Sequence, residues 1–229
     1  MFQGYTQETV DFMWGIRFNN ERGWFLEHKQ QYQTQLLEPT RALGEQVYEG
    51  VQEMLPHEPL MLKMSRIYRD ARRLFGRGPY KDHLWFCVRT GDKDWTGRPT
   101  FYFEIAPDYY SYGMGFWQAP AELMEAFRRD LQEHPQKFGK LVRSFEKQDV
   151  FTLSGDSYAR SRGEVEDRLR PWFQKKSITL THELPLDEKI FQPQLAEEIL
   201  ENFKLLVPFY KYFAGLCASV ARRQQEEEN

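Results

Sequence analysis

Alternating apolar and polar positions in the middle of the chain predict three β-strands. Every second residue is apolar in Leu84–Val88, Phe101–Ile105 and Tyr110–Phe116. A period of two is typical of a strand that buries one face in a sheet. The connections between these strands are short, which favours an antiparallel meander over about residues 83–117. The same alternation predicts flanking strands near Val150–Leu153 and Ser177–Leu184.

Both ends of the chain instead repeat apolar residues every third or fourth position, as helices do. The N-terminal pattern predicts a short helix from Thr6 to Ile16, a stop and new N-cap at Asn19–Asn20, and a long helix, or two in line, from Glu21 to Leu55. A C-terminal helix from Leu195 to Val220 carries Pro208, which we expect to kink or split it.

Further helices are predicted at 121–133, 135–147 and 164–173. Helices on either side of a run of strands are typical of an α+β fold. We therefore predict a single α+β domain over residues 1–223, in which N-terminal and C-terminal helices pack on a central antiparallel sheet. The polar residues 224–229 are predicted to be a disordered tail.

Composition narrows the function classes. The 229 residues are 41% hydrophobic, enough for a sizeable core, and the net charge of −3 argues against a nucleic-acid-coating protein. Cys87 and Cys217 are predicted to be buried free thiols, and no signal segment or membrane-spanning run is found, which indicates a cytoplasmic protein. The histidines and cysteines lack metal-binding spacing, so no metal site is predicted, and no cofactor is indicated.

The strongest candidate for chemistry is the cassette RIYRDARRLFGRGPYK, residues 66–81. It places six cations around one acid, Asp70, in a protein that is acidic overall. Guanidinium groups bind phosphate and carboxylate in a bidentate manner, so the cassette predicts a site for a small anionic or phosphorylated ligand. The candidate ligand-binding residues of the cassette are Arg66, Arg69, Arg72, Tyr80 and Lys81, with Asp70 as a candidate acid or base.

A structural alternative stays open. Arginines beside a strand edge also pair with acids or protect the edge, and the cassette would then be an ion-pair network in an interaction or scaffold protein. Extended geometry would put Arg66, Tyr68, Asp70 and Arg72 on one face, whereas a helix would group Arg66, Arg69, Asp70 and Arg73.

Two other segments have a functional and a packing interpretation. Trp24, His28 and Tyr32 repeat at i, i+4, i+8, so they form either a pocket wall, with His28 as acid or base and Lys29 as anion contact, or a packed aromatic face. The glycines of Gly113–Trp117 indicate close approach of a ligand or of another backbone.

These segments, taken in order, resemble the bacterial and fungal family grouped as domain of unknown function 2461. The matching residues span nearly the whole chain: Phe2–Tyr5, Asn19–Asn20, Trp24–Phe25, His28–Lys29, Tyr32, Arg66–Asp70, Arg72, Pro79–Lys81, Gly113–Gly115 and Trp117.

The resemblance implies the family's fold and supplies no activity. It also implies that Trp24, Arg66, Arg69, Asp70, Tyr80 and Lys81 belong to one site. Two segments depart from the family pattern. An aromatic residue usually follows the second arginine of the Arg-Asp motif, which is Arg72 here, and this chain has Arg73 instead. Residues 158–163 lack a proline-containing motif rich in leucine and lysine.

Overall fold

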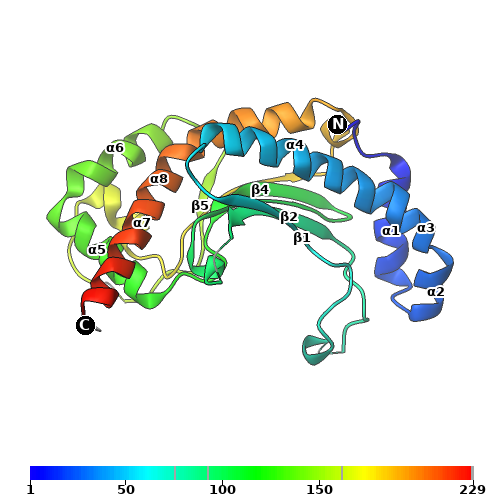
Figure 1. Cartoon of the computed structure of the whole chain (residues 1–229), viewed down its shortest axis with the longest axis horizontal. Coiled ribbons are helices and arrows are strands. Elements are labelled where there is room, and N and C mark those ends of the chain that lie inside the picture. Colours follow the sequence, from blue (N-terminus) through cyan, green and yellow to red (C-terminus); the bar gives the residue numbers. More distant parts are fainter. Residues whose placement is uncertain (75, 92, 161, 228–229) are drawn as a thin grey trace. The chain divides into compact units, whose positions relative to one another are not determined.

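The computed structural model describes residues 1–74, 76–91, 93–160 and 162–227, without the side chains of Arg73 and Glu227. Phe75 of the cassette therefore lies outside the described residues. The fold is α+β, as predicted: a six-stranded antiparallel sheet with the strand order β1-β2-β3-β4-β6-β5, and helices from both ends of the chain (Figure 1).

The predicted meander is confirmed, because β2, β3 and β4 are neighbours in the sheet. The strands are β1 (Leu60–Met64), β2 (Leu84–Thr90), β3 (Thr100–Ile105), β4 (Tyr109–Gly115), β5 (Thr152–Ser154) and β6 (Thr179–Pro185). Strand β5 pairs antiparallel with β6. Strand β1 was not predicted, although Leu60 is buried and Met61 and Lys63 are exposed, as a period of two requires.

The helices follow the predicted segments with some changes. They are α1 (Gln7–Phe18), α2 (Arg22–Glu27), α3 (Lys29–Gln31), a π-helical segment (Tyr32–Leu37), α4 (Glu38–Met54), α5 (Ala121–Glu133), α6 (Pro135–Phe145), α7 (Arg170–Phe173) and α8 (Leu195–Glu227). Short 3-10 helices occupy Ala71–Arg73, Trp95–Gly97, Asp167–Leu169 and Glu188–Phe191.

Three helix predictions need correction or qualification. The long helix expected from Glu21 is interrupted at His28, where α2 ends, and Asn20 does not cap it, because Glu21 takes that position. Helix α8 is not split at Pro208. It also continues to Glu227, into the segment expected to be a disordered tail, and residues 228–229 lie outside the described residues.

The described residues group into two compact units, each made of three chain segments. The first unit comprises residues 1–88, 102–112 and 183–201, and the second comprises residues 89–101, 113–182 and 202–229. Strands β2, β3 and β4 each contribute residues to both units, so no single linker separates them. One domain over residues 1–223 stays a prediction.

In the first unit, helix α4 packs on β1 through a buried face that includes Leu43, Val47 and Val51. Figure 1 shows the chain between β1 and β2, which contains the cassette, leaving the sheet away from α4. The cassette contacts Asn20, between α1 and α2, and Phe25 of α2 through Tyr80.

The π-helical turn before α4 has an identifiable cause. Pro39 has no backbone N–H, so the carbonyl of Gln35 four residues earlier cannot receive its usual helical hydrogen bond. The Thr9 hydroxyl of α1 donates to that carbonyl instead, at 2.6 Å, while the Glu38 N–H bonds back to Gln33. Segment 32–37 is therefore wider than an α-helix and is tied to α1, and such turns, rare overall, are frequently found at functional sites.

In the second unit, aromatic side chains of α5, α6, α7 and α8 fill the core. Phe138 contacts Phe127 and Trp172 edge-to-face, at centroid distances of 5.0 and 5.1 Å, and Trp172 stacks on Phe209 at 5.5 Å. Cys217 is buried in this unit and Cys87 in the first, and both are free thiols, as predicted.

The glycines of β4 serve the sheet. A Cβ atom on Gly113 would lie 2.0 Å from the Leu180 carbonyl oxygen, and one on Gly115 would lie 2.8 Å from that of Ile178. Leu180 lies in β6 and Ile178 directly precedes this strand, and both contacts are with backbone atoms. Of the two interpretations of Gly113–Trp117, close approach of another backbone therefore accounts for these two glycines.

We expect Gly113→Ala to lower the unfolding free energy by about 1–3 kcal/mol, because its methyl group would push β4 from β6. The control is Gly215→Ala in α8, where nothing lies within 4 Å of the added methyl group. The unfolding free energy of Gly215→Ala is expected to rise by about 0.5–1 kcal/mol, because alanine favours a helix more than glycine does. Thermal unfolding measures both, and an unchanged melting temperature for Gly113→Ala would contradict the close approach.

Candidate functional site

The cassette folds back on itself as a short antiparallel pair. The Arg69 N–H donates to the Pro79 carbonyl at 2.8 Å and the Lys81 N–H donates to the Ile67 carbonyl at 2.7 Å. Tyr68 and Tyr80 form the bridge between them. Of the two geometries considered from the sequence, residues 67–69 therefore adopt the extended one.

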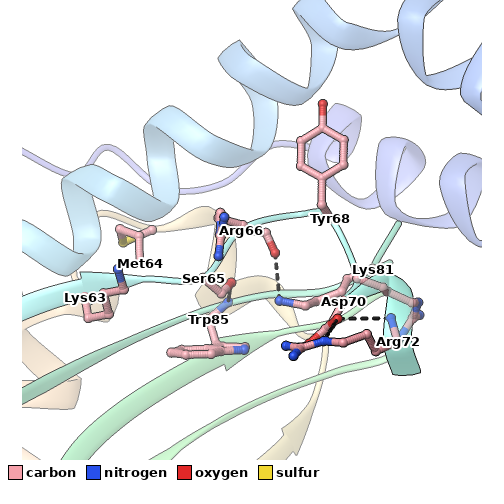
Figure 2. Close-up of a pocket in the computed structure, with 10 residues that line it drawn as sticks. Lys63, Met64, Ser65, Arg66, Tyr68, Asp70, Arg72, Lys81 and Trp85 are labelled. Carbon is pink, nitrogen blue, oxygen red and sulfur yellow. Dashed lines mark hydrogen bonds and ion pairs between the residues drawn. The ribbon is translucent and has the colours of Figure 1, made fainter. Parts of the chain in front are cut away.

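This pairing brings Arg66 and Lys81 together although they are 15 positions apart. The Lys81 ammonium donates to the Arg66 carbonyl at 2.7 Å, as Figure 2 shows. It also lies 5.7 Å from the centre of the Trp85 ring, a cation–π distance.

Beside this pair lies a cavity of about 560 Å³, within the usual size range of small-molecule sites. We call it the arginine cavity. It is lined by Lys63, Met64, Ser65, Arg66, Tyr68, Arg69, Asp70, Arg72, Lys81 and Trp85. Five cationic side chains and one carboxylate thus converge on one space, and all five belong to the first unit.

The cations of the arginine cavity are not equally available. The Arg66 guanidinium and the Lys63 ammonium have no hydrogen-bond or ion-pair partner within the described part of the chain. Burial, with the neighbouring charges of Arg69 and Arg66, lowers the pKa of Lys81, and the carboxylate of Glu104 opposes that effect. An anion placed here would relieve the repulsion between these cations.

Asp70 holds Arg72. Its carboxylate accepts hydrogen bonds from the Arg72 backbone N–H and guanidinium, the shortest at 2.8 Å, and Figure 2 shows the pair at the edge of the cavity. The side chains are 39% and 87% exposed, so solvent screens the ion pair. Asp70 is the single carboxylate among the described lining residues.

Arg69 has a different role from Arg66. Its guanidinium donates to the Tyr80 carbonyl at 2.8 Å and lies 3.7 Å from Asp82, and only 17% of its side chain is exposed. Asp82 also accepts from Arg17 at 2.6 Å and lies 3.0 Å from the His83 ring nitrogen. These contacts form an ion-pair network that fixes the base of the cassette.

Asp82 was not singled out in the sequence. The hydrogen bonds from His83 and Arg17 lower its pKa far below the usual range, although burial acts in the opposite direction. Its main partner, Arg17, lies 65 positions away, so no local pattern reveals the pair. Lys63 and Trp85 were also missed, although the alternation of β1 and β2 places both on the partly exposed face.

Asn20 attaches the cassette to the α1–α2 corner. Its side-chain amide donates to the Tyr80 carbonyl at 3.0 Å, and its amide oxygen accepts from the Tyr80 N–H at 2.9 Å. A Cβ atom on Gly78 would lie 2.2 Å from that oxygen, so glycine is required for the approach. The Tyr80 ring is buried and stacks on Phe25 at 4.2 Å.

The remaining candidate residues lie elsewhere in the first unit. Trp24 and His28 stack on each other at 3.9 Å, and the His28 Nδ1 atom lies 2.8 Å from the Trp24 carbonyl. The Trp24 ring also packs against Gly15 and Phe12. Neither residue lines the arginine cavity, and Tyr80 does not line it either. Arg66, Arg69, Asp70, Arg72 and Lys81 all do.

Comparison with known protein families identifies the chain. A family model described as conserved hypothetical protein (DUF2461) matches residues 8–212. The chain belongs to this family. No significant match was found among curated proteins. The match covers every segment on which the resemblance rested except Phe2–Tyr5, which precedes it.

Within residues 1–74, 76–91, 93–160 and 162–227, no group of three or more His, Cys, Asp or Glu side chains is arranged to hold a metal ion. In the same residues, no helix has the length and apolar character needed to cross a membrane.

We expect Asp82→Asn to lower the unfolding free energy at neutral pH by about 1–3 kcal/mol, since it removes charge-assisted hydrogen bonds. The pKa of Asp82 is lower in the folded state, so its contribution is present above about pH 4 and is lost as the pH falls further. Urea unfolding at neutral pH and at about pH 3 measures the difference from wild type, which shrinks in acid.

The control for this prediction is Asp108→Asn. Asp108 also pairs with Arg17, at 3.2 Å, but its side chain is 53% exposed. We expect Asp108→Asn to lower the unfolding free energy by less than about 1 kcal/mol. Equal effects of the two variants would contradict the network described for Asp82.

A second prediction concerns the Asn20 contact. We expect Asn20→Ala and Gly78→Ala each to destabilise the protein by about 1–3 kcal/mol, because each removes the same pair of hydrogen bonds to Tyr80. The double variant is expected to be little worse than either single one, as for residues that act together. Additive losses in a chemical-denaturation cycle would show that the two positions act separately.

Proposed function

We propose that the protein binds a small anionic or phosphorylated molecule in the arginine cavity. The observation that carries the proposal is the convergence of five cations on one space of about 560 Å³ in a protein with a net charge of −3. Arg66 and Lys81 are the central contacts, because the guanidinium of Arg66 has no partner among the described residues and the Lys81 ammonium is held at the Arg66 carbonyl, 2.7 Å away.

The chemistry of these groups favours phosphate or carboxylate. The planar guanidinium of Arg66 offers parallel N–H donors to two oxygens, and the ammonium of Lys81 adds a compact charge. Partial burial of Lys81 strengthens its attraction for an anion, because water screens it less. Arg72 and Lys63 would complete the ring of positive charge at the opening.

A catalytic role would fall first to Asp70, the carboxylate at the cavity edge. Its position beside Arg72 keeps it near any ligand bound there. His28, the other candidate acid or base, stacks on Trp24 instead. We therefore propose ligand binding. If the protein also catalyses a reaction, Asp70 would act as the acid or base, together with the cations that line the arginine cavity.

The alternative of a structural ion-pair network in a non-enzymatic scaffold protein is supported for part of the cassette. Arg69, with Asp82 and the Tyr80 carbonyl as partners, has the contacts of a structural arginine. Among the described residues, the side chains of Arg66 and Lys63 make no such structural contacts. We infer that the cassette combines a structural base with a ligand-binding surface. The free thiols Cys87 and Cys217 support a reducing compartment such as the cytoplasm.

Thermal-shift measurements with pyrophosphate, nucleoside monophosphates, sugar phosphates and dicarboxylates test the proposal. We expect at least one anion to raise the melting temperature of the wild type, since a ligand at about 100 times its Kd adds about 2.7 kcal/mol of stability. The shift is expected to disappear in Arg66→Gln/Lys81→Gln, each shift being measured against the same variant without ligand.

The matched control is Lys140→Gln/Lys147→Gln, which removes two exposed positive charges from the second unit. This variant is expected to keep the shift. The proposal is wrong if no anion stabilises the wild type, or if the Arg66→Gln/Lys81→Gln variant is stabilised as strongly as the control.

A further inference from the structure

A second cavity, of about 340 Å³, lies on the other side of the segment that carries Arg66. We call it the aromatic cavity. It is bounded by the α2–α3 turn, the π-helical segment, the start of α4 and residues 64–68. It shares Met64, Ser65, Arg66 and Tyr68 with the arginine cavity but contains neither Lys81 nor Arg69.

The walls of this cavity are mainly aromatic and apolar. Phe25 is buried at its base and contacts Tyr68 edge-to-face at 5.9 Å and Tyr32 at 5.7 Å. Leu37, from the π-helical segment, adds an aliphatic side chain. In Figure 2, Tyr68 points away from Asp70 and Arg72, toward the helices. A flat hydrophobic group can pack against such rings, which favour stacked or edge-to-face contacts.

The charges at this cavity are all positive. Lys29, Arg41 and Arg66 line it, from three different parts of the chain, and no acidic residue is among the described lining residues. None of these three side chains has a hydrogen-bond or ion-pair partner in the described ranges. A ligand that carries a carboxylate would therefore be matched in charge at the rim.

Tyr32 supplies a polar group inside. The residue is 9% exposed, and its hydroxyl makes no hydrogen bond to any described residue. Burial raises the pKa of Tyr32 to about 12, so the hydroxyl is a neutral donor at physiological pH. A ligand oxygen in this cavity would give the hydroxyl a hydrogen-bond partner that the described residues do not supply.

We propose that the aromatic cavity binds a small aromatic carboxylate, with its ring against the aromatic wall formed by Phe25 and Tyr68 and its carboxylate toward Lys29 and Arg41. The π-helical turn is part of the site, because it places both Tyr32 and Leu37 in the wall. This site goes beyond the anion site of the arginine cavity, since it requires neither Lys81 nor Arg69.

Ligand-observed NMR and calorimetry with phenylacetate test this proposal on the full chain. We expect phenylacetate to bind, whereas acetate, which lacks the ring, and 2-phenylethanol, which lacks the charge, bind at least about tenfold more weakly. The Lys29→Gln/Arg41→Gln variant is expected to lose about tenfold or more in affinity for phenylacetate. Both side chains are exposed, so its melting temperature is expected to stay near that of the wild type.

Lys81→Gln is the matched control, because it removes a cation from the arginine cavity alone. It is expected to leave phenylacetate binding unchanged, and Leu37→Trp, which narrows the aromatic cavity without changing charge, is expected to abolish it. The proposal is overturned if phenylacetate does not bind at millimolar concentration, or if Lys29→Gln/Arg41→Gln binds it like the wild type. It is also overturned if Lys81→Gln loses the binding, which would place the ligand in the arginine cavity.

Discussion

The hydrogen bonds between the Asn20 side chain and the backbone of Tyr80 are the contact on which both cavities depend. They join chain segments 60 positions apart and satisfy both backbone polar groups of one residue. A buried backbone group without a partner is costly, so this pairing strongly restricts where the cassette can lie. Gly78 permits the approach, and the Phe25–Tyr80 stack adds hydrophobic area to the same junction.

Once Tyr80 is fixed, the positions of the arginines follow. The backbone pairing of residues 67–69 with 79–81 is antiparallel and sets Lys81 opposite Ile67, within reach of the Arg66 carbonyl. Arg69 turns instead to the Tyr80 carbonyl and to Asp82. One short cassette thus contains an arginine whose charge is used inside the protein and another whose charge is left for a partner. A residue count alone cannot separate these two uses.

Local patterns predicted the parts of the fold that have a local cause. The strands β2 to β4 and helices α5 and α6 were found because their periodicity is visible within a few residues. The π-helical turn was not, because it depends on Thr9 of α1 reaching the carbonyl freed by Pro39. The candidate site was predicted only in part for the same reason, because some of its contacts join residues that are far apart in the sequence. Arg66 and Lys81 share a short segment, whereas Asp82 depends on the distant Arg17.

Arg66 lines both cavities, and this shared position links the two proposals. A single guanidinium cannot make its full set of hydrogen bonds to two separate anions at once. Two anions near it would also repel each other in a partly buried space. Independent ligands in the two cavities would therefore weaken each other's binding, and thermodynamic reciprocity requires the effect to be equal in both directions.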